Sequence, residues 1–279
     1  MKYSKLKLVV SLLCIFSVGL VYAQKTDKTP SDSGYKLVWA DEFNYRGLPE
    51  AKKWGYDTIG NKSGWGNHEA QFYTAGRKEN VWVHDGVLSI IAQKEEMRGK
   101  KYTSTRLITK DKGDWLYGRF EIKAKLPAGK GMWPAIWMLP TDWAYGQWPS
   151  SGEIDIMENV GYKPDTIYGS LHTKSYYFRI NTQKTKGVAI VDNHTAFHVY
   201  ALEWEPEQIR LIVDDNVYLS FNNEHNTYKE WPFDKRFHIL LNIAVGGDWG
   251  GQQGIDDQIF PQRMDVDYVR VYQKEAAHK

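Results

Sequence analysis

Cysteine is almost absent from this chain of 279 residues, which contains a single one, Cys14. A chain with one cysteine cannot form an internal disulfide, so its stability must come from a hydrophobic core. Leu13 precedes Cys14, whereas lipoprotein processing usually needs a small residue at that position, so we do not expect a lipid anchor. If the leader described next is removed, the remaining chain has no thiol, which excludes cysteine catalysis.

Long apolar runs are also scarce. The longest, Leu8 to Val21, is about 14 residues long, whereas a membrane-spanning helix needs roughly 20. Three lysines precede this run, and Ala23 follows it in the sequence Val-Tyr-Ala, which is the order of a secretory signal peptide. We therefore expect residues 1–23 to be a signal peptide, with export to the periplasm or the extracellular space. After cleavage we expect no stable membrane insertion.

Clusters of basic residues are missing as well. Removal of the three leader lysines changes the formal charge from +2 to −1, since +2 − 3 = −1. With no basic stripe and no recognition motif, we expect no nucleic-acid partner. Residues 24–34 are polar and are expected to form a flexible lead-in. Residues 35–274 are expected to form one domain, and we expect the protein to be a monomer.

The chain is rich in aromatic residues and in short segments that alternate between apolar and polar residues. It contains 12 Trp and 18 Tyr. Most of these should fill the core, but exposed indole faces also stack on sugar rings, so the composition is compatible with a carbohydrate cleft. Residues 118–126 alternate strictly between apolar and polar, and Asp85-Gly86 between two apolar runs predicts a hairpin. Many short strands without a long helical period indicate an all-β sandwich or barrel.

The segment GEIDIMEN places three carboxylates within six residues. On a regular strand Glu153 and Asp155 share one face, but strict alternation would turn Glu158 toward the core. A lone buried carboxylate is costly. One extra residue, a β-bulge at about Ile156-Met157, would return Glu158 to the face of the other two acids. We therefore predict a bulge and a single row of carboxyl groups.

Such a row suits glycoside hydrolysis. With the bulge, the Cα atoms of Glu153 and Glu158 would lie roughly 13 Å apart, and the side chains could bring the carboxyls to about 5–5.5 Å, the separation in a retaining glycosidase. One glutamate would act as nucleophile and the other as acid/base, with Asp155 assisting, but these residues alone do not say which glutamate has which role. A solvated acidic strand face and a divalent-cation site remain as alternatives.

Several segments resemble glycoside hydrolase family 16 β-glucanases, in the order of that family: LVWADEF, YGRFEIKAKLPAGKGMWPAIWMLP, WPSSGEIDIMENVG, LHT, FHVYALEW, LNIAVGGDWGG and FPQRMDVDYVRVYQ. The resemblance implies a β-jelly-roll sandwich of two antiparallel sheets, with a substrate cleft on the concave face. It also implies a retaining mechanism in which Glu153 is the nucleophile, Asp155 its helper and Glu158 the acid/base. No cofactor is expected for catalysis.

The extra residue Met157 narrows the resemblance to the laminarinase type, which cleaves β-1,3-glucan within the chain. We therefore expect a secreted endo-β-1,3-glucanase whose partner is a β-glucan polysaccharide. Mixed-linkage glucan, agarose and carrageenan remain as alternative substrates. A non-catalytic glucan-binding protein is the alternative from another functional class, although such proteins usually lose a catalytic glutamate and both are present here.

The resemblance and the surrounding sequence also suggest supporting residues. Expected contacts with sugar come from Trp133, Trp137, Trp148, His172, Asn67, Arg106 and Trp249. His172 is expected on the neighbouring strand, where it could bond the acid/base or a sugar. Some members of the family hold a structural Ca²⁺, and the matching positions are Glu42, the backbone of Gly86, and Asp267.

Overall fold

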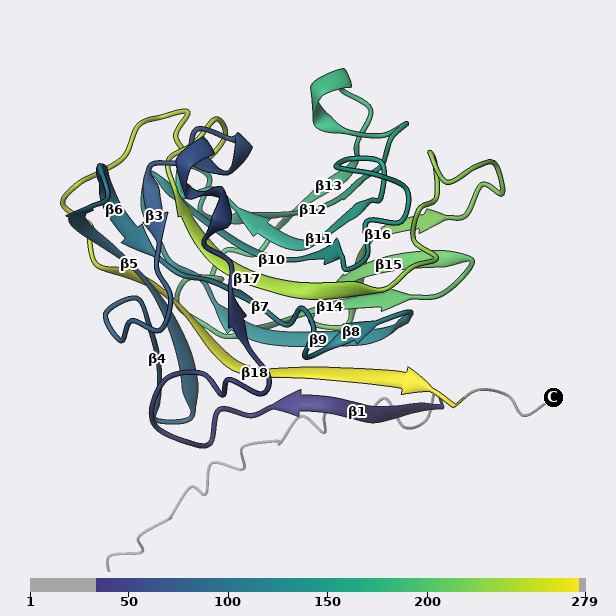
Figure 1. Ribbon diagram of the computed structural model, residues 1–279, viewed down its shortest axis with the longest axis horizontal. Coiled ribbons are helices and arrows are strands. Elements are labelled where there is room, and N and C mark those ends of the chain that lie inside the picture. Colours follow the sequence, from purple (N-terminus) through teal and green to yellow (C-terminus); the bar gives the residue numbers. More distant parts are fainter. Residues whose placement is uncertain (1–33, 276–279) are drawn as a thin grey trace, which may run out of the picture.

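The computed structural model describes residues 34–275 and contains two large β-sheets packed face to face (Figure 1). The predicted signal peptide and nearly all of the predicted lead-in lie outside the described residues. Between the strands are two short 3₁₀ helices, η2 (Ile59–Gly66) and η3 (Phe178–Ile180). Within the described residues no helix is long and apolar enough to cross a membrane.

The first sheet has ten strands in the order β16-β15-β14-β9-β18-β5-β6-β3, with β1 paired to β18 and β4 paired to β5. All of its pairs are antiparallel except β3 with β6. Its strands are β1 (Tyr35–Asp41), β3 (Gln71–Tyr73), β4 (Val81–His84), β5 (Val87–Met97), β6 (Lys100–Ser104), β9 (Gly118–Lys125), β14 (His198–Trp204), β15 (Gln208–Val213), β16 (Asn216–Asn222) and β18 (Gln262–Lys274).

The second sheet has eight strands in the order β13-β12-β11-β10-β17-β7-β2, with β8 paired to β17. All of these pairs are antiparallel. Its strands are β2 (Gly55–Tyr56), β7 (Arg106–Ile108), β8 (Asp114–Trp115), β10 (Met132–Pro140), β11 (Glu153–Asn159), β12 (Thr166–His172), β13 (Lys184–Ala189) and β17 (Phe237–Val245). The predicted sandwich of two largely antiparallel sheets is therefore confirmed.

The core lies between the sheets, and the alternation of the sequence explains how it forms. In β9, Phe120, Ile122 and Ala124 are fully buried, as their period of two predicts. The predicted hairpin between β4 and β5 turns at Asp85 and Gly86, whose φ angles of 50° and 79° suit the tight turns that join antiparallel strands. Strand β17 departs from alternation because all of its residues are buried at the centre of its sheet.

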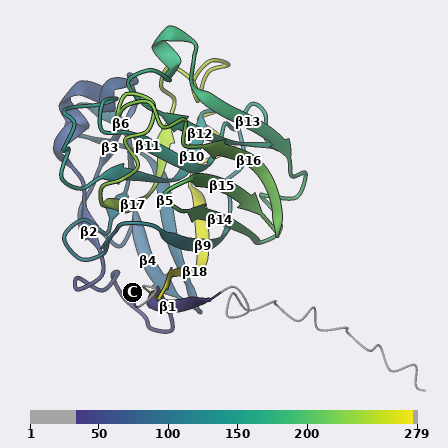
Figure 2. The same cartoon turned by 90° about the vertical axis from the view of Figure 1, so that its right-hand side faces the viewer.

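Two connecting segments rise above the second sheet and frame its open face. Figure 1 shows the segment around η2, in dark purple, on one side and the segment around η3, in green, on the other. The view turned by 90° shows β10, β11 and β12 in the layer above β14, β9 and β18 (Figure 2). Residues from both helices line the cleft described next.

Candidate active site

Strand β11 carries the predicted bulge. Asp155 pairs with Ser170 of β12, and Glu158 pairs with Tyr168, so two residues of β11 lie opposite a single residue of β12. Met157 is consequently fully buried with the apolar side chains of the strand. The three acids then lie on the other face, toward the cleft, which confirms the predicted bulge and the row of carboxyl groups.

A tyrosine of the opposite sheet holds this bulge. The hydroxyl of Tyr218, on β16, donates a hydrogen bond to the backbone carbonyl of Ile156, one of the two bulged residues. Its ring passes over Gly169, the residue opposite the bulge. A Cβ atom at Gly169 would lie 2.3 Å from the Tyr218 oxygen. Glycine at this position therefore leaves the space that the tyrosine needs.

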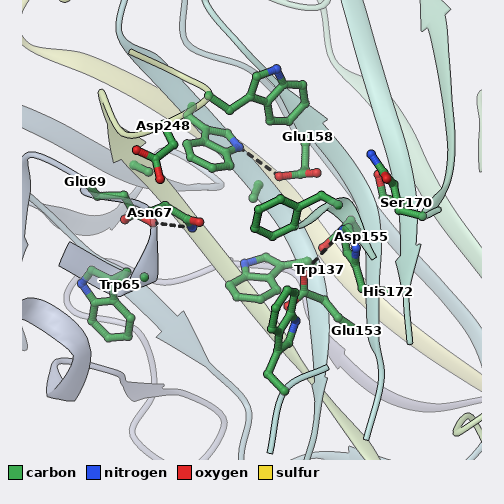
Figure 3. Close-up of a pocket in the computed structure, with 18 of the residues that line it drawn as sticks. Trp65, Asn67, Glu69, Trp137, Glu153, Asp155, Glu158, Ser170, His172 and Asp248 are labelled. Carbon is green, nitrogen blue, oxygen red and sulfur yellow. Dashed lines mark hydrogen bonds and ion pairs between the residues drawn. The ribbon is translucent and has the colours of Figure 1, made fainter. Parts of the chain in front are cut away.

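The bulged strand forms the floor of a cleft of about 820 Å³ (Figure 3). The structure brings together in this cleft all ten residues that the sequence suggested for catalysis and substrate contact: Asn67, Arg106, Trp133, Trp137, Trp148, Glu153, Asp155, Glu158, His172 and Trp249. They come from distant parts of the chain, so their convergence in one cleft supports a common site.

Each glutamate is held by one indole N–H group. Trp148 Nε1 donates to Glu153 Oε2 at 3.0 Å, and Trp133 Nε1 donates to Glu158 Oε1 at 3.0 Å. A hydrogen bond from a neutral donor fixes the direction of a carboxyl group without neutralising its charge. Trp133 and Trp148 therefore position the two acids in addition to lining the cleft.

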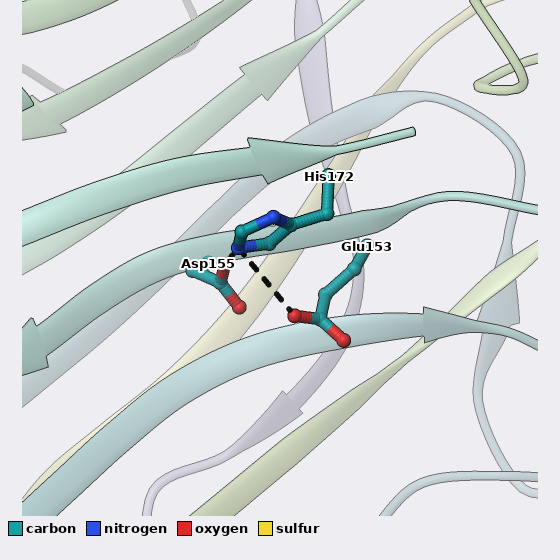
Figure 4. A group of neighbouring side chains, drawn as sticks. All are labelled: Glu153, Asp155 and His172. Atoms are coloured by element: carbon teal, nitrogen blue, oxygen red, sulfur yellow. Dashed lines mark ion pairs between the residues drawn. The ribbon is translucent and has the colours of Figure 1, made fainter. Parts of the chain in front are cut away.

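His172 lies beside Glu153 and Asp155 (Figure 4). Because β11 and β12 pair Glu153 with His172, the imidazole Nε2 reaches 3.3 Å from Asp155 Oδ2 and 3.9 Å from Glu153 Oε1. The sequence suggested a hydrogen bond from His172 to the acid/base or a sugar. The observed carboxyl contacts are with Asp155 and Glu153 rather than with Glu158, since the strand register pairs His172 with Glu153.

The electrostatics of the row favour protonation. Burial is the main cause that raises the pKa of Glu153, Asp155 and Glu158, each to about 8, and for both glutamates the charge of Asp155 raises it further. Three adjacent, largely buried carboxyls do not all ionise at neutral pH. The row therefore holds protons at pH 7, as a pair of catalytic acids with different protonation states requires.

Arg106 is not a surface charge. The residue is 7% exposed, and its guanidinium carbon lies 4.2 Å from the ring centroid of Trp65 and 4.5 Å from that of Trp137. The Trp137 indole N–H also donates to Asn242 Oδ1 at 2.7 Å. Arg106 and Asn242 together fix the orientation of Trp137 in the cleft.

A model of the family described as glycosyl hydrolases family 16 matches residues 68–270 of the chain. The chain belongs to glycosyl hydrolase family 16. A β-glucanase of Rhodothermus marinus is 50% identical over 268 residues, which cover 94% of this chain and 92% of that protein. Membership confirms the family resemblance of the sequence and makes the chain a glycoside hydrolase.

Solved structures agree with the fold of this family 16 enzyme. The laminarinase of Rhodothermus marinus has a TM-score of 0.83 at 52% identity, covering 86% of this chain and 97% of that one. A mutant of SCLam, a non-specific endo-β-1,3(4)-glucanase from family GH16, has a TM-score of 0.84 at 51% identity, covering 87% and 96%. That mutant presents a 1,3-β-D-cellobiosyl-glucose at its active site.

One buried carboxylate in the cleft of the family 16 enzyme, Glu69, was not predicted from the sequence. Glu69 is 5% exposed and accepts hydrogen bonds from Gln71 at 2.6 Å, Asn67 at 3.3 Å and the Tyr73 hydroxyl at 3.4 Å. Burial raises its pKa. Tyr73 also accepts a bond from Asn242 at 3.0 Å, so Glu69 connects to the partner of Trp137.

Other cleft residues were not predicted either, because none of them stands out in the sequence. They include Trp65, Trp143, Tyr168, Phe178, Arg179, Asn242 and Asp248. Two signals were available. Trp65 and Glu69 flank Asn67 in the segment GWGNHEAQF, and Asn242 interrupts the apolar run of residues 239–245 in β17.

The three predicted calcium positions have other roles in the structure. The carboxylate of Glu42 accepts two hydrogen bonds from Arg270, at 2.8 and 2.9 Å. Asp267 Oδ2 lies 2.7 Å from Lys123 Nζ, and Gly86 forms the hairpin turn. A calcium ion would have to displace both ion pairs, so the structure does not favour the site as predicted from the sequence.

The role of Tyr218 leads to a first prediction. Tyr218→Phe removes the hydroxyl and leaves the Ile156 carbonyl without that bond, so the free energy of unfolding should fall by about 1–2 kcal/mol. Because the bulge aims Glu158, kcat should also fall, by at least about tenfold. Urea unfolding and initial-rate kinetics measure the two effects.

Tyr200→Phe is the matched control. Tyr200 is fully buried, and its hydroxyl has no hydrogen-bond partner among the described residues. Its removal should therefore leave stability and kcat unchanged. Equal effects of the two substitutions would show that Tyr218 has no specific role at the bulge.

The raised pKa values lead to a second prediction. A carboxyl whose pKa is near 4.5 in the unfolded chain and about 8 in the folded one keeps its proton only in the fold, so stability falls as the pH rises through that window. Glu158→Gln removes this contribution. The variant should gain at least about 1 kcal/mol relative to wild type between pH 5 and pH 8.

Chemical denaturation at the two pH values measures this difference. Glu96→Gln changes an exposed glutamate on β5 and should shift stability equally at both. If the Glu158→Gln variant behaves like this control, burial does not shift the titration of the carboxyl row.

Proposed function

We propose that this family 16 enzyme is a retaining endo-glycosidase that hydrolyses β-1,3-glucan. The observation that carries the proposal is the bulged strand, which directs Glu153, Asp155 and Glu158 into the same cleft. The pKa of each of these three carboxyl groups is raised. Two carboxyl groups, one ionised and one protonated, are the working parts of glycoside hydrolysis. No cofactor enters this reaction because the carboxyls supply both the nucleophile and the proton.

The roles of the two glutamates follow the family resemblance and the surroundings of each. Glu153 lies beside His172, and the positive charge of Arg106 favours its ionised form, as a nucleophile needs. Among the described residues, only the neutral indole N–H of Trp133 donates a hydrogen bond to Glu158. We assign Glu153 as nucleophile and Glu158 as acid/base.

The reaction then takes two displacements. The Glu153 carboxylate bonds to the anomeric carbon while the glycosidic C–O bond breaks, and Glu158 gives its proton to the leaving oxygen. Glu158, now ionised, takes a proton from water, whose oxygen attacks the anomeric carbon and releases Glu153. Asp155 assists by sharing a proton with the neighbouring carboxyl groups when Glu153 is not bonded to a sugar.

The charges of the cleft favour a neutral polysaccharide. Among the described residues, five acids line it but only two permanent cations, Arg106 and Arg179, and Arg106 is enclosed by indole rings. A sulfated polymer would find few cationic partners in this cleft, which disfavours carrageenan. The laminarinase relatives, and the relative that presents a 1,3-β-linked oligosaccharide at its active site, favour β-1,3-glucan.

The aromatic residues supply surfaces for sugar rings. We propose that Trp137 stacks on sugar with the ring face that Arg106 does not cover, and that Trp133 and Trp249 serve a neighbouring sugar. Trp249 lies edge-on to Trp133, with ring centroids 5.5 Å apart. The polar groups of Asn67 and His172 would bond sugar hydroxyls, and Trp148 would wall the other end of the carboxyl row.

Export is proposed from the sequence of residues 1–23 alone, with a periplasmic or extracellular destination. A polymeric substrate is consistent with such a location, since polysaccharides do not enter cells intact. The chain is proposed to act as a monomer. Structural calcium at Glu42, Gly86 and Asp267 is not part of the proposal, because Arg270 and Lys123 already neutralise the two carboxylates.

A substrate panel tests the proposed function. The wild-type protein should release reducing ends from laminarin faster than from mixed-linkage glucan, with no release from agarose or carrageenan. Glu153→Gln and Glu158→Gln should each lower the rate on laminarin by at least about 10³-fold, because each removes one half of the carboxyl pair. A matching thermal unfolding profile for each variant shows that the fold is intact.

Azide separates the two roles. On a glucoside with an activated leaving group, azide should restore turnover of Glu158→Ala with a β-glycosyl azide as product, because small anions replace water in the second displacement. The same anion should give an α-glycosyl azide with Glu153→Ala. The reverse pattern would exchange the roles, and either glutamine variant with near-full activity would refute the proposal.

A further inference from the structure

Glu153, Asp155 and His172 form a compact set of oxygen and nitrogen donors. Within residues 34–275 it is the one group of three acidic, cysteine or histidine side chains whose potential ligand atoms all lie within 4.8 Å of one another. The three side chains converge from two neighbouring strands, as Figure 4 shows. We call them the donor triad.

The distances in the donor triad suit a small divalent ion. Zinc binds histidine nitrogen and carboxylate oxygen at about 2.0–2.2 Å, so adjacent ligands of a tetrahedral ion lie roughly 3.4 Å apart. His172 Nε2 lies 3.3 Å from Asp155 Oδ2 and 3.9 Å from Glu153 Oε1. All three potential ligand atoms lie within 4.8 Å of one another, so a small movement of the side chains would complete the geometry.

A second observation also points to a cation. Asp155 is 3% exposed, and its Oδ2 atom accepts no hydrogen bond from any described residue. A buried carboxylate oxygen without a donor is costly, and a positive ligand would remove that cost. This oxygen is the one that faces His172 Nε2, so the unsatisfied atom is directed into the donor triad.

The donor types select the class of ion. Calcium prefers six to eight oxygen ligands, whereas one imidazole and two carboxylates match zinc and its neighbours in the transition series. The cleft leaves one side of the triad open, so water can fill the fourth position. His172 Nδ1 has no partner among the described residues, and the lack of such support should keep the affinity moderate.

We propose that the donor triad is a binding site for one zinc-type divalent ion, and that the bound ion inhibits hydrolysis. An ion coordinated by Glu153 occupies the oxygen that would attack the anomeric carbon. The inhibition rests on the proposed role of Glu153, whereas binding of the ion does not depend on that role.

Isothermal titration calorimetry of the full chain with zinc chloride tests the site. We expect one ion per chain, and at least about tenfold weaker binding by Glu153→Gln and by His172→Gln, each of which removes a ligand. Glu158→Gln is the matched control, because it makes the same change five residues further along the row but outside the triad. Its zinc affinity should equal that of the wild type.

Calcium chloride serves as the matched ion and cobalt chloride as a second probe. Calcium should give no saturable heat. Tetrahedral cobalt absorbs visible light far more strongly than cobalt in water, so the wild-type protein should gain intense bands at one equivalent. No saturable zinc binding, no such bands, or equal weakening by Glu158→Gln would overturn the site.

Activity assays separate this proposal from the proposed function. Zinc at saturating concentration should abolish release of reducing ends from laminarin, and a chelator should restore it. Zinc that binds the triad while hydrolysis continues would retain the metal site but contradict the assignment of Glu153 as nucleophile.

Discussion

One hydrogen bond between the two sheets determines the geometry of the site. Tyr218 reaches from β16 to the Ile156 carbonyl, and so holds the extra residue of β11 in place. Without the bulge, a period of two would bury Glu158 and expose Met157. Two features of the site depend on this local departure from the pleat: the shared face of the three acids, and the hydrogen bond from Trp133 to Glu158.

The carboxyl row shows how this fold exchanges stability for chemistry. Most of the sandwich obeys the simple rule that apolar side chains face the core, as Phe120, Ile122 and Ala124 of β9 show. The row breaks the rule by desolvating three acids together, which disfavours their charged forms. The same burial keeps a proton available at neutral pH, which an acid/base catalyst requires. Trp133 and Trp148 orient the two glutamates without placing a positive charge beside them.

Much of this could be predicted from the sequence, and the failures have a common cause. The strands, the hairpin at Asp85-Gly86 and the bulge follow from periodicity and turn chemistry, which are local properties. Three features join segments far apart in the chain: the Tyr218 contact, the stacking around Arg106 and the hydrogen bonds of Glu69. No local sequence pattern predicts such contacts. The ion pairs at the predicted calcium positions could not be foreseen either, because Arg270 and Lys123 reach Glu42 and Asp267 only once strands pair.

The stereochemistry of hydrolysis tests the central claim most directly, because it reports whether the bulge brings the two glutamates close enough for a covalent intermediate. Proton NMR of laminarin during the first minutes of reaction, before the sugar equilibrates, resolves the anomeric signals of the new reducing ends. A bulged row in which Glu153 attacks the anomeric carbon predicts that the β anomer appears first and the α anomer grows later. Initial release of the α anomer would mean direct attack by water, and would contradict the account.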